Sequence, residues 1–273
     1  MLNLNHKIAY IFGGSSGIGL ATAERLARCG AHVFIFARNR ERLARAAKQI
    51  SGQRLSEEQN IDYMQLDVSI ETEVQKVVAI AVKRFGVPDL LVNCAGRNYP
   101  HRFFDIGPAQ LDETMKINFY GVWNTTRALV PLMQTKGGHI VNVSSIAGFV
   151  GVYGFTDYCA SKFAIVGFSE ALRSELKPLG IKVSVLCPPD TETPGFEIEN
   201  QTKPEETKAI SAKAKLMRPD AVAEALIKGL QKGKPVIIPG FDGKLTFWAK
   251  RYFPWVVEFI MDWTIKNVQK HKQ

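Results

Sequence analysis

Short runs of apolar residues alternate along the chain with longer segments in which apolar residues recur every three or four positions. The short runs are typical of strands buried on both faces, and the longer segments are typical of amphipathic helices. The predicted strands are residues 8–12, 32–37, 61–66, 89–93, 139–144, 182–187 and 235–239. The predicted helices include residues 18–29, 40–50, 70–85, 108–133, 158–177 and 219–232. This alternation predicts an α/β fold with a doubly wound parallel sheet of the Rossmann type.

The length of 273 residues fits one domain of this class. We expect residues 1–241 to form a single dinucleotide-binding catalytic domain. Residues 191–217 are polar and follow the sixth predicted strand, where a long connection is usually functional, so we expect them to form a substrate lid. Residues 242–273 are rich in aromatic side chains and form a separate C-terminal segment.

The four cysteines are far apart and include no Cys-x-x-Cys pair, which favours free thiols in a reducing compartment over a disulfide or zinc framework. We therefore expect no metal site. The net charge of +9 raises the question of nucleic-acid binding, but no recognition motif accompanies the basic residues. Neither a basic leader followed by an apolar run nor a long uncharged apolar stretch is evident. We expect a cytoplasmic protein that does not bind nucleic acid.

A glycine-rich turn with the pattern Gly13-x-x-x-Gly17-x-Gly19 follows the first predicted strand and opens the first predicted helix. Glycines let a backbone turn tightly against a pyrophosphate, and a helix N-terminus supplies free N–H groups and partial positive charge. The flanking strand and helix make a dinucleotide site the favoured interpretation. We expect cofactor contacts from Gly13, Ser15, Ser16, Gly17, Ile18, Gly19, Arg38, Arg42, Asp67, Val68, Asn93, Ala95, Gly96, Tyr158, Lys162, Pro188, Thr191 and Thr193.

The end of the second predicted strand indicates which dinucleotide is bound. It reads Ala37-Arg38-Asn39, where an acidic residue would bind the adenosine ribose of NAD and an arginine can pair with the 2′-phosphate of NADP. A guanidinium group suits phosphate because its donors form a planar fork. We expect NADPH as the cofactor, with Arg38 as the main determinant. Arg45 and Lys48 lie farther along the same basic segment and are expected to be solvated.

Two further strand ends fall at the same edge of the predicted sheet. Asp67 ends the third strand, where it can meet the adenine or cap the following helix. Asn93-Cys94-Ala95-Gly96 ends the fourth strand, and its small residues let a cofactor lie close to the backbone.

Three side chains of complementary chemistry, Ser145, Tyr158 and Lys162, follow the fifth predicted strand. Tyr158 and Lys162 are four residues apart at the start of a predicted helix, so they share a face. A free phenol has a pKa near ~10, and an adjacent ammonium group lowers that pKa. Ser145 can hold a substrate oxygen, and Asn118 can position Lys162 or a relay water. We expect these four residues to be catalytic, with Tyr158 protonating a ketone that receives a hydride.

These motifs, in their order and spacing over residues 6–240, resemble those of the short-chain dehydrogenase/reductase family. The resemblance implies a doubly wound sheet, a nicotinamide cofactor and an Asn-Ser-Tyr-Lys catalytic set, which falls on the four residues above. It also implies a homodimer or homotetramer. Two residues depart from the family's pattern, because Phe12 stands where threonine is usual and Cys94 replaces a common second asparagine. We expect the hydrogen bonds that brace those two turns to be made differently.

The segment after the sixth predicted strand carries a narrower resemblance. It contains Pro188-Pro189 where the family more often has Pro-Gly, and residues 154–156 and 199–207 complete the pattern. These stretches resemble 3-ketodihydrosphingosine reductases, which implies NADPH-dependent reduction of the C3 ketone of a long-chain amino ketone, a sphingoid base. A 3-oxoacyl thioester, a steroid or a retinoid is the alternative substrate.

A sphingoid substrate carries an ammonium group, for which Glu192, Glu197 and Glu199 each offer a negative charge. The sequence does not choose among them. A different class of function, a catalytically inactive dinucleotide sensor, is disfavoured by the intact catalytic set.

The C-terminal segment concentrates tryptophan, tyrosine and phenylalanine. Plotted as one helix, its polar residues fall on a narrow stripe made of Arg251, Glu258, Asp262, Lys266 and Gln269. Such a helix suits the interface of a membrane, which predicts peripheral contact on the cytosolic face. Packing of this segment on the protein core or on another subunit is the equally weighted alternative.

Overall fold

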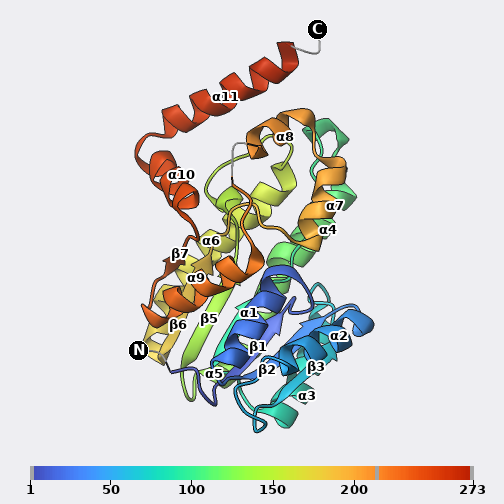
Figure 1. Ribbon diagram of the computed structural model, residues 1–273, viewed down its shortest axis with the longest axis vertical. Helices are drawn as coiled ribbons and strands as arrows, with labels where there is room; N and C mark the ends of the chain where they lie inside the picture. Colours follow the sequence, from blue (N-terminus) through green and yellow to red (C-terminus); the bar gives the residue numbers. More distant parts are fainter. Residues whose placement is uncertain (1–2, 213–214, 271–273) are drawn as a thin grey trace.

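Seven parallel strands form the central sheet, in the order β3-β2-β1-β4-β5-β6-β7 (Figure 1). The computed structural model describes residues 3–212 and 215–270. Residues 1–2 of the expected catalytic domain, 213–214 of the expected lid and 271–273 of the C-terminal segment lie outside the described residues. The strands are β1 (Ile8–Phe12), β2 (His32–Ala37), β3 (Ile61–Gln65), β4 (Leu90–Asn93), β5 (Gly138–Val143), β6 (Ile181–Leu186) and β7 (Val236–Ile237). The main helices are α1 (Gly17–Arg28), α2 (Arg40–Ser51), α3 (Glu71–Phe85), α4 (Pro108–Met115), α5 (Gly121–Met133), α6 (Thr156–Leu176), α7 (Pro194–Thr202), α8 (Glu205–Ser211), α9 (Pro219–Gln231), α10 (Phe241–Tyr252) and α11 (Pro254–Lys270).

Helices cover both faces of the sheet, which explains why its strands are apolar at most positions. Along β1, Tyr10 and Phe12 face the cluster that includes α3, α5 and α6, whereas Ala9 and Ile11 face the cluster that includes α1, α2 and α9. A strand buried on both sides cannot alternate apolar with polar residues. The predicted doubly wound α/β fold is confirmed.

The order of the strands reverses between β1 and β4, which lie side by side with Phe12 opposite Asn93. In such sheets, ligands bind beyond the carboxyl ends of the strands at this switch point. The β1–α1 turn and the residues that follow β4 therefore meet at one edge of the sheet.

The helix predicted over residues 108–133 is interrupted. Lys116–Tyr120 form a π-helical turn, η2, between α4 and α5. A π turn inserts an extra residue into a helix and occurs frequently at functional sites. Asn118 lies in this turn, fully buried, and its amide bonds to the backbone N–H and C=O of Arg97 at 2.8 and 3.0 Å. The interruption thus ties the helix to the segment after β4.

The expected lid contains two helices, α7 and α8, rather than a simple loop. Thr193 caps α7 by accepting a hydrogen bond from the Phe196 N–H at 3.1 Å. Thr207 of α8 donates to the Tyr153 carbonyl at 2.7 Å, which attaches the lid to the segment before α6. The first bond thus starts α7 within the lid, and the second anchors the lid to the rest of the chain through α8.

The single C-terminal helix assumed in the sequence plot is wrong. Pro254 cannot donate the hydrogen bond that would continue α10, so α10 ends at Tyr252 and α11 begins at Pro254. Arg251 therefore does not share a helix with Glu258. Helix α11 packs against α8, as the upper part of Figure 1 shows. Within the described residues, no helix has an apolar stretch long enough to cross a bilayer.

Candidate active site

A cavity of about 1380 Å³ opens at the carboxyl edge of the sheet. Its walls come from the β1–α1 turn, the ends of β2 to β6, the start of α6, the lid and the two C-terminal helices. Pockets for one small ligand commonly enclose about 300–1,000 Å³. This cavity therefore has room for a dinucleotide and a second ligand.

The β1–α1 turn forms one end of the cavity and depends on glycine. Gly13 has a φ of +86°, and a Cβ there would lie 2.6 Å from the Ala95 backbone nitrogen. A Cβ on Gly19 would lie 2.2 Å from the Gly13 carbonyl oxygen. Glycine at both positions lets the turn close against the end of β4 and leaves the N-terminus of α1 facing the cavity.

Two arginines line the cavity at the end of β2. Arg38 and Arg42 are exposed, and neither guanidinium has an acidic ion-pair partner within the described part of the chain. Asn39 caps α2 by accepting from the Arg42 N–H at 2.8 Å, which brings Arg42 next to Arg38 at the start of the helix. These free cations suit a phosphate group.

All the predicted cofactor residues line the cavity except Gly19 and Asn93. Asn93 is buried below it, where its amide donates to Asn142 and Thr126 and accepts from Thr125. Asn93 thus braces β4, β5 and α5 from beneath. The sequence places Asn93 at a strand end, but this position does not determine whether the side chain faces the cavity or the core.

Asp67 does not cap the following helix, because the N-cap residue of α3 is Ile70 and no side chain bonds there. Asp67 lines the cavity, and its Oδ1 accepts from the N–H and hydroxyl of Ser69 at 2.9 and 2.7 Å. These bonds shape the turn that leads into α3.

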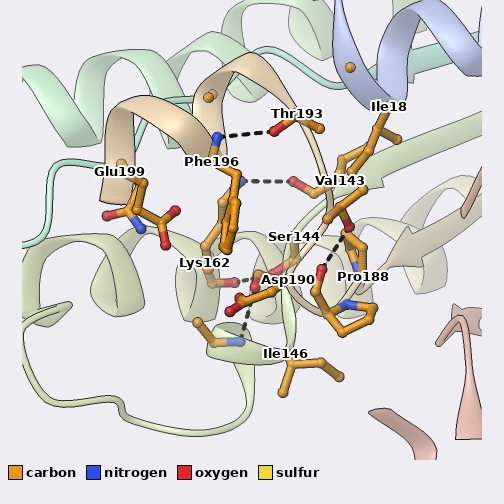
Figure 2. Close-up of a pocket in the computed structure, with 18 of the residues that line it drawn as sticks. Ile18, Val143, Ser144, Ile146, Lys162, Pro188, Asp190, Thr193, Phe196 and Glu199 are labelled. Carbon is orange, nitrogen blue, oxygen red and sulfur yellow. Dashed lines mark hydrogen bonds between the residues drawn. The ribbon is translucent and has the colours of Figure 1, made fainter. Parts of the chain in front are cut away.

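The four predicted catalytic residues lie around the ends of β4 and β5 and the first turns of α6. A Cβ on Gly96 would lie 3.4 Å from Asn118 Oδ1 and 3.5 Å from Lys162 Nζ, so these two side chains meet over the segment after β4. Lys162 Nζ donates to the Val143 carbonyl at 3.1 Å, as Figure 2 shows, and lies 5.4 Å from the centre of the Tyr158 ring. Asn118 donates to the Ser161 hydroxyl at 2.9 Å, which attaches η2 to α6 at the residue next to Lys162.

The pKa of Tyr158 is shifted upward, against the direction expected from Lys162. Burial raises this pKa most, the carboxylates of Glu199 and Asp190 raise it further, and the nearby Ser145 hydroxyl opposes the shift. Tyr158 therefore carries its proton throughout the neutral range. A protonated phenol is the form that can donate a proton to a ketone.

Lys162 is almost completely buried, and this burial lowers its pKa to about 8. Desolvation disfavours the charged ammonium group. Neutral pH is close enough to this value that Lys162 can change its charge within the working range of an enzyme.

Two carboxylates, Asp190 just before the lid and Glu199 within it, lie close enough to Tyr158 to raise its pKa. Asp190 and Glu199 line the cavity (Figure 2). Glu192 and Glu197 are not among its lining residues. Glu199 forms an ion pair with the buried Lys203 at 2.7 Å, while Asp190 has no ion-pair partner within the described residues. Burial raises the pKa of Glu199, and the neighbouring Lys203 opposes this shift. Sequence reasoning missed Asp190, although it stands directly after the doubled proline.

The comparison with protein families decides the class of the molecule. The family model described as short chain dehydrogenase matches residues 7–204. The chain belongs to the short-chain dehydrogenase family. This short-chain dehydrogenase is 39% identical over 235 residues to a 3-ketodihydrosphingosine reductase of Bos taurus, covering 85% of the chain and 71% of the relative. A 3-ketodihydrosphingosine reductase of Dictyostelium discoideum is 36% identical over 245 residues, covering 84% and 73%.

Solved structures of other short-chain dehydrogenases share the architecture. One from Burkholderia phymatum in complex with NAD is 25% identical, with a TM-score of 0.77 over 87% of this chain and 90% of that one. One from Sphingobium yanoikuyae in complex with NADPH is 26% identical, with a TM-score of 0.74 over 85% and 87%. Because these two relatives bind different dinucleotides, the choice between NAD and NADP depends on the residues of the present chain.

Proposed function

We propose that this short-chain dehydrogenase reduces the C3 ketone of 3-ketodihydrosphingosine to dihydrosphingosine with NADPH, a step of sphingolipid biosynthesis. The observation that carries the proposal is the pair of carboxylates, Asp190 and Glu199, beside Tyr158. The substrate is a 2-amino-3-ketone, so its ammonium group is attached to the carbon next to the carbonyl. A residue that recognises this ammonium must therefore lie beside the proton donor. The similarity to reductases named for this substrate supports the same conclusion.

The cavity fits NADPH. The glycine turn leaves space for a pyrophosphate at the N-terminus of α1, and the unpaired Arg38 and Arg42 suit the 2′-phosphate. When bound, NADPH supplies the hydride that reduces the carbonyl carbon. Lys162 would hold the nicotinamide ribose by hydrogen bonds, and Asn118 acts as a positioning residue through the backbone of Arg97 and the hydroxyl of Ser161.

Tyr158 donates its proton to the carbonyl oxygen as that oxygen gains negative charge. The Ser145 hydroxyl holds the same oxygen by a hydrogen bond. The upward shift in the pKa of Tyr158 keeps the proton on the phenol until it is needed. The ammonium of the bound substrate compensates the negative charge of Asp190 and Glu199, which makes the transfer easier.

The function is tested by following cofactor absorbance with purified protein, NADPH and a panel of ketones. We expect 3-ketodihydrosphingosine to be reduced with a higher kcat/KM than a 3-oxoacyl thioester, a steroid or a retinoid. A preference for any of the other three would replace the proposed substrate. Asp190→Asn tests recognition of the amine separately from reduction of the ketone. This variant should lower kcat/KM for the amino ketone and leave kcat/KM unchanged for the same ketone without the amine.

We also propose that the outer face of α11 contacts a membrane interface on the cytosolic side. Trp255, Phe259 and Trp263 are 68%, 68% and 54% exposed and follow one another at helical spacing. Aromatic side chains at such spacing suit the interfacial region of a bilayer. Flotation with phospholipid vesicles tests this contact, and replacing all three residues with serine should abolish it. Unchanged flotation of that variant would contradict the proposal.

A further inference from the structure

The cavity extends beyond Tyr158 into an apolar arm, which we define by Ile210 of α8, Leu245 and Ala249 of α10, and Val257, Ile260 and Met261 of α11. These residues come from segments far from the catalytic motifs in sequence. They nevertheless line the same cavity as Tyr158 and Ser145.

The arm begins directly at the catalytic centre. A Cβ on Gly243, in the first turn of α10, would lie 3.4 Å from the side chain of Ile146, which follows Ser145. The rings of Phe149 and Phe247 are 4.8 Å apart, which fixes α10 against the turn after β5. Helix α10 is therefore attached beside the residue that holds the substrate oxygen.

Helix α11 presents one face to the arm. Val257, Ile260, Met261 and Thr264 line the cavity at spacings of three and four residues, so they lie on the same side of the helix. Ile260 is 48% exposed, and Leu245 on α10 is 57% exposed. Apolar side chains that remain this accessible within the wall of a cavity mark a surface for an apolar ligand.

We propose that the apolar arm binds the alkyl chain of the ketone substrate, so that α10 and α11 set the preferred chain length. This inference depends on the proposed function. The alkyl chain starts at the carbonyl carbon that Tyr158 and Ser145 hold, and it must leave the catalytic centre along an apolar path. Ile146 begins that path and the arm continues it.

The experiment compares a homologous series of 2-amino-3-ketones of increasing chain length. Burying one methylene contributes about 0.8 kcal/mol, which corresponds to a rise of about fourfold in kcat/KM per added carbon until the arm is filled. Met261→Trp should block the arm, and excluding two or three methylenes lowers the ratio of long-chain to short-chain kcat/KM by about 15- to 60-fold. Asp262→Trp places the same side chain one residue along, on an exposed position outside the cavity, and should leave the ratio unchanged.

A second variant, Leu245→Trp, tests the same arm from α10. An equal loss on all chain lengths in both tryptophan variants, with NADPH binding retained, would overturn the inference, as would an unchanged ratio. The unmodified protein separates the two proposals. Failure to reduce any amino ketone contradicts the function, whereas reduction without dependence on chain length contradicts only the arm.

Discussion

The choice of cofactor gives a quantitative prediction, because Arg38 lines the cavity and has no acidic partner among the described residues. Replacing Arg38 with alanine removes a charge-assisted contact to the 2′-phosphate, and hydrogen bonds to charged groups contribute about 1.5–3 kcal/mol. That range corresponds to a fall of about 10- to 150-fold in kcat/KM for NADPH. NADH lacks the 2′-phosphate, so its kcat/KM should stay the same.

Arg38→Asp should change the preference further. A carboxylate repels the 2′-phosphate of NADPH and accepts a hydrogen bond from the ribose hydroxyl of NADH. We therefore expect kcat/KM for NADPH to fall more than in Arg38→Ala and kcat/KM for NADH to rise. Steady-state kinetics with both cofactors and one ketone measure this directly.

Two controls test whether Arg38 itself selects the cofactor. Arg45 lies on α2, the helix that follows Arg38, but it is exposed and outside the cavity, so Arg45→Ala should leave both cofactors unaffected. Because Arg38 is exposed, added salt should weaken its effect by screening. Equal use of NADH and NADPH by the unmodified protein would refute the assignment, as would an equal loss for both cofactors in Arg38→Ala.

Three further predictions concern the catalytic centre and the assembly. Tyr158→Phe should lower kcat about 100- to 10,000-fold while NADPH still binds, as measured by nucleotide fluorescence, and substantial residual turnover would contradict its role as proton donor. Burial lowers the pKa of Lys162 to about 8, so its ammonium group is present below that pH and lost above it. The value of kcat/KM for NADPH should therefore fall as pH rises through about 8. Lys162→Arg should remove this fall because arginine stays charged. Trp123 on α5 and Phe163 on α6 are exposed aromatic residues that suit the interface of a homodimer. Trp123→Glu should therefore shift the mass in solution to that of a monomer. An unchanged mass would show that this face is not the dimer interface.

The parts of the fold that the sequence predicted well are those set by local patterning. The strands are recognisable because burial on both faces requires apolar residues throughout, and the β1–α1 turn is recognisable because Gly13 and Gly19 leave no space for a side chain. The interruption at Asn118 was not predicted. A π turn differs from an α-helix by one inserted residue, which the apolar spacing of residues 108–133 does not reveal.

The electrostatics of the site could not be predicted from its motifs. The expectation for Tyr158 relied on the positive charge of Lys162, four residues away, and omitted Asp190 just before the lid and Glu199 within it. Which of Glu192, Glu197 and Glu199 can meet a substrate ammonium likewise depends on which side of the lid faces the cavity, and only Glu199 of the three lines it. The break between α10 and α11 could have been predicted from the sequence, because Pro254 cannot continue a helix.

Helix α8 connects the two features that distinguish this site from a generic ketone reductase. Its Thr207 bonds to the Tyr153 carbonyl, in the segment that leads to Tyr158, and the same helix packs against α11. Glu199 on α7 precedes it by only a few residues. A shift of α8 would therefore move the amine-binding carboxylate and the wall of the apolar arm together. If the amine and the alkyl chain bind as proposed, their recognition is coupled through one short helix. The losses in kcat/KM caused by removing the amine and by shortening the alkyl chain should therefore not be additive in free energy when both changes are combined.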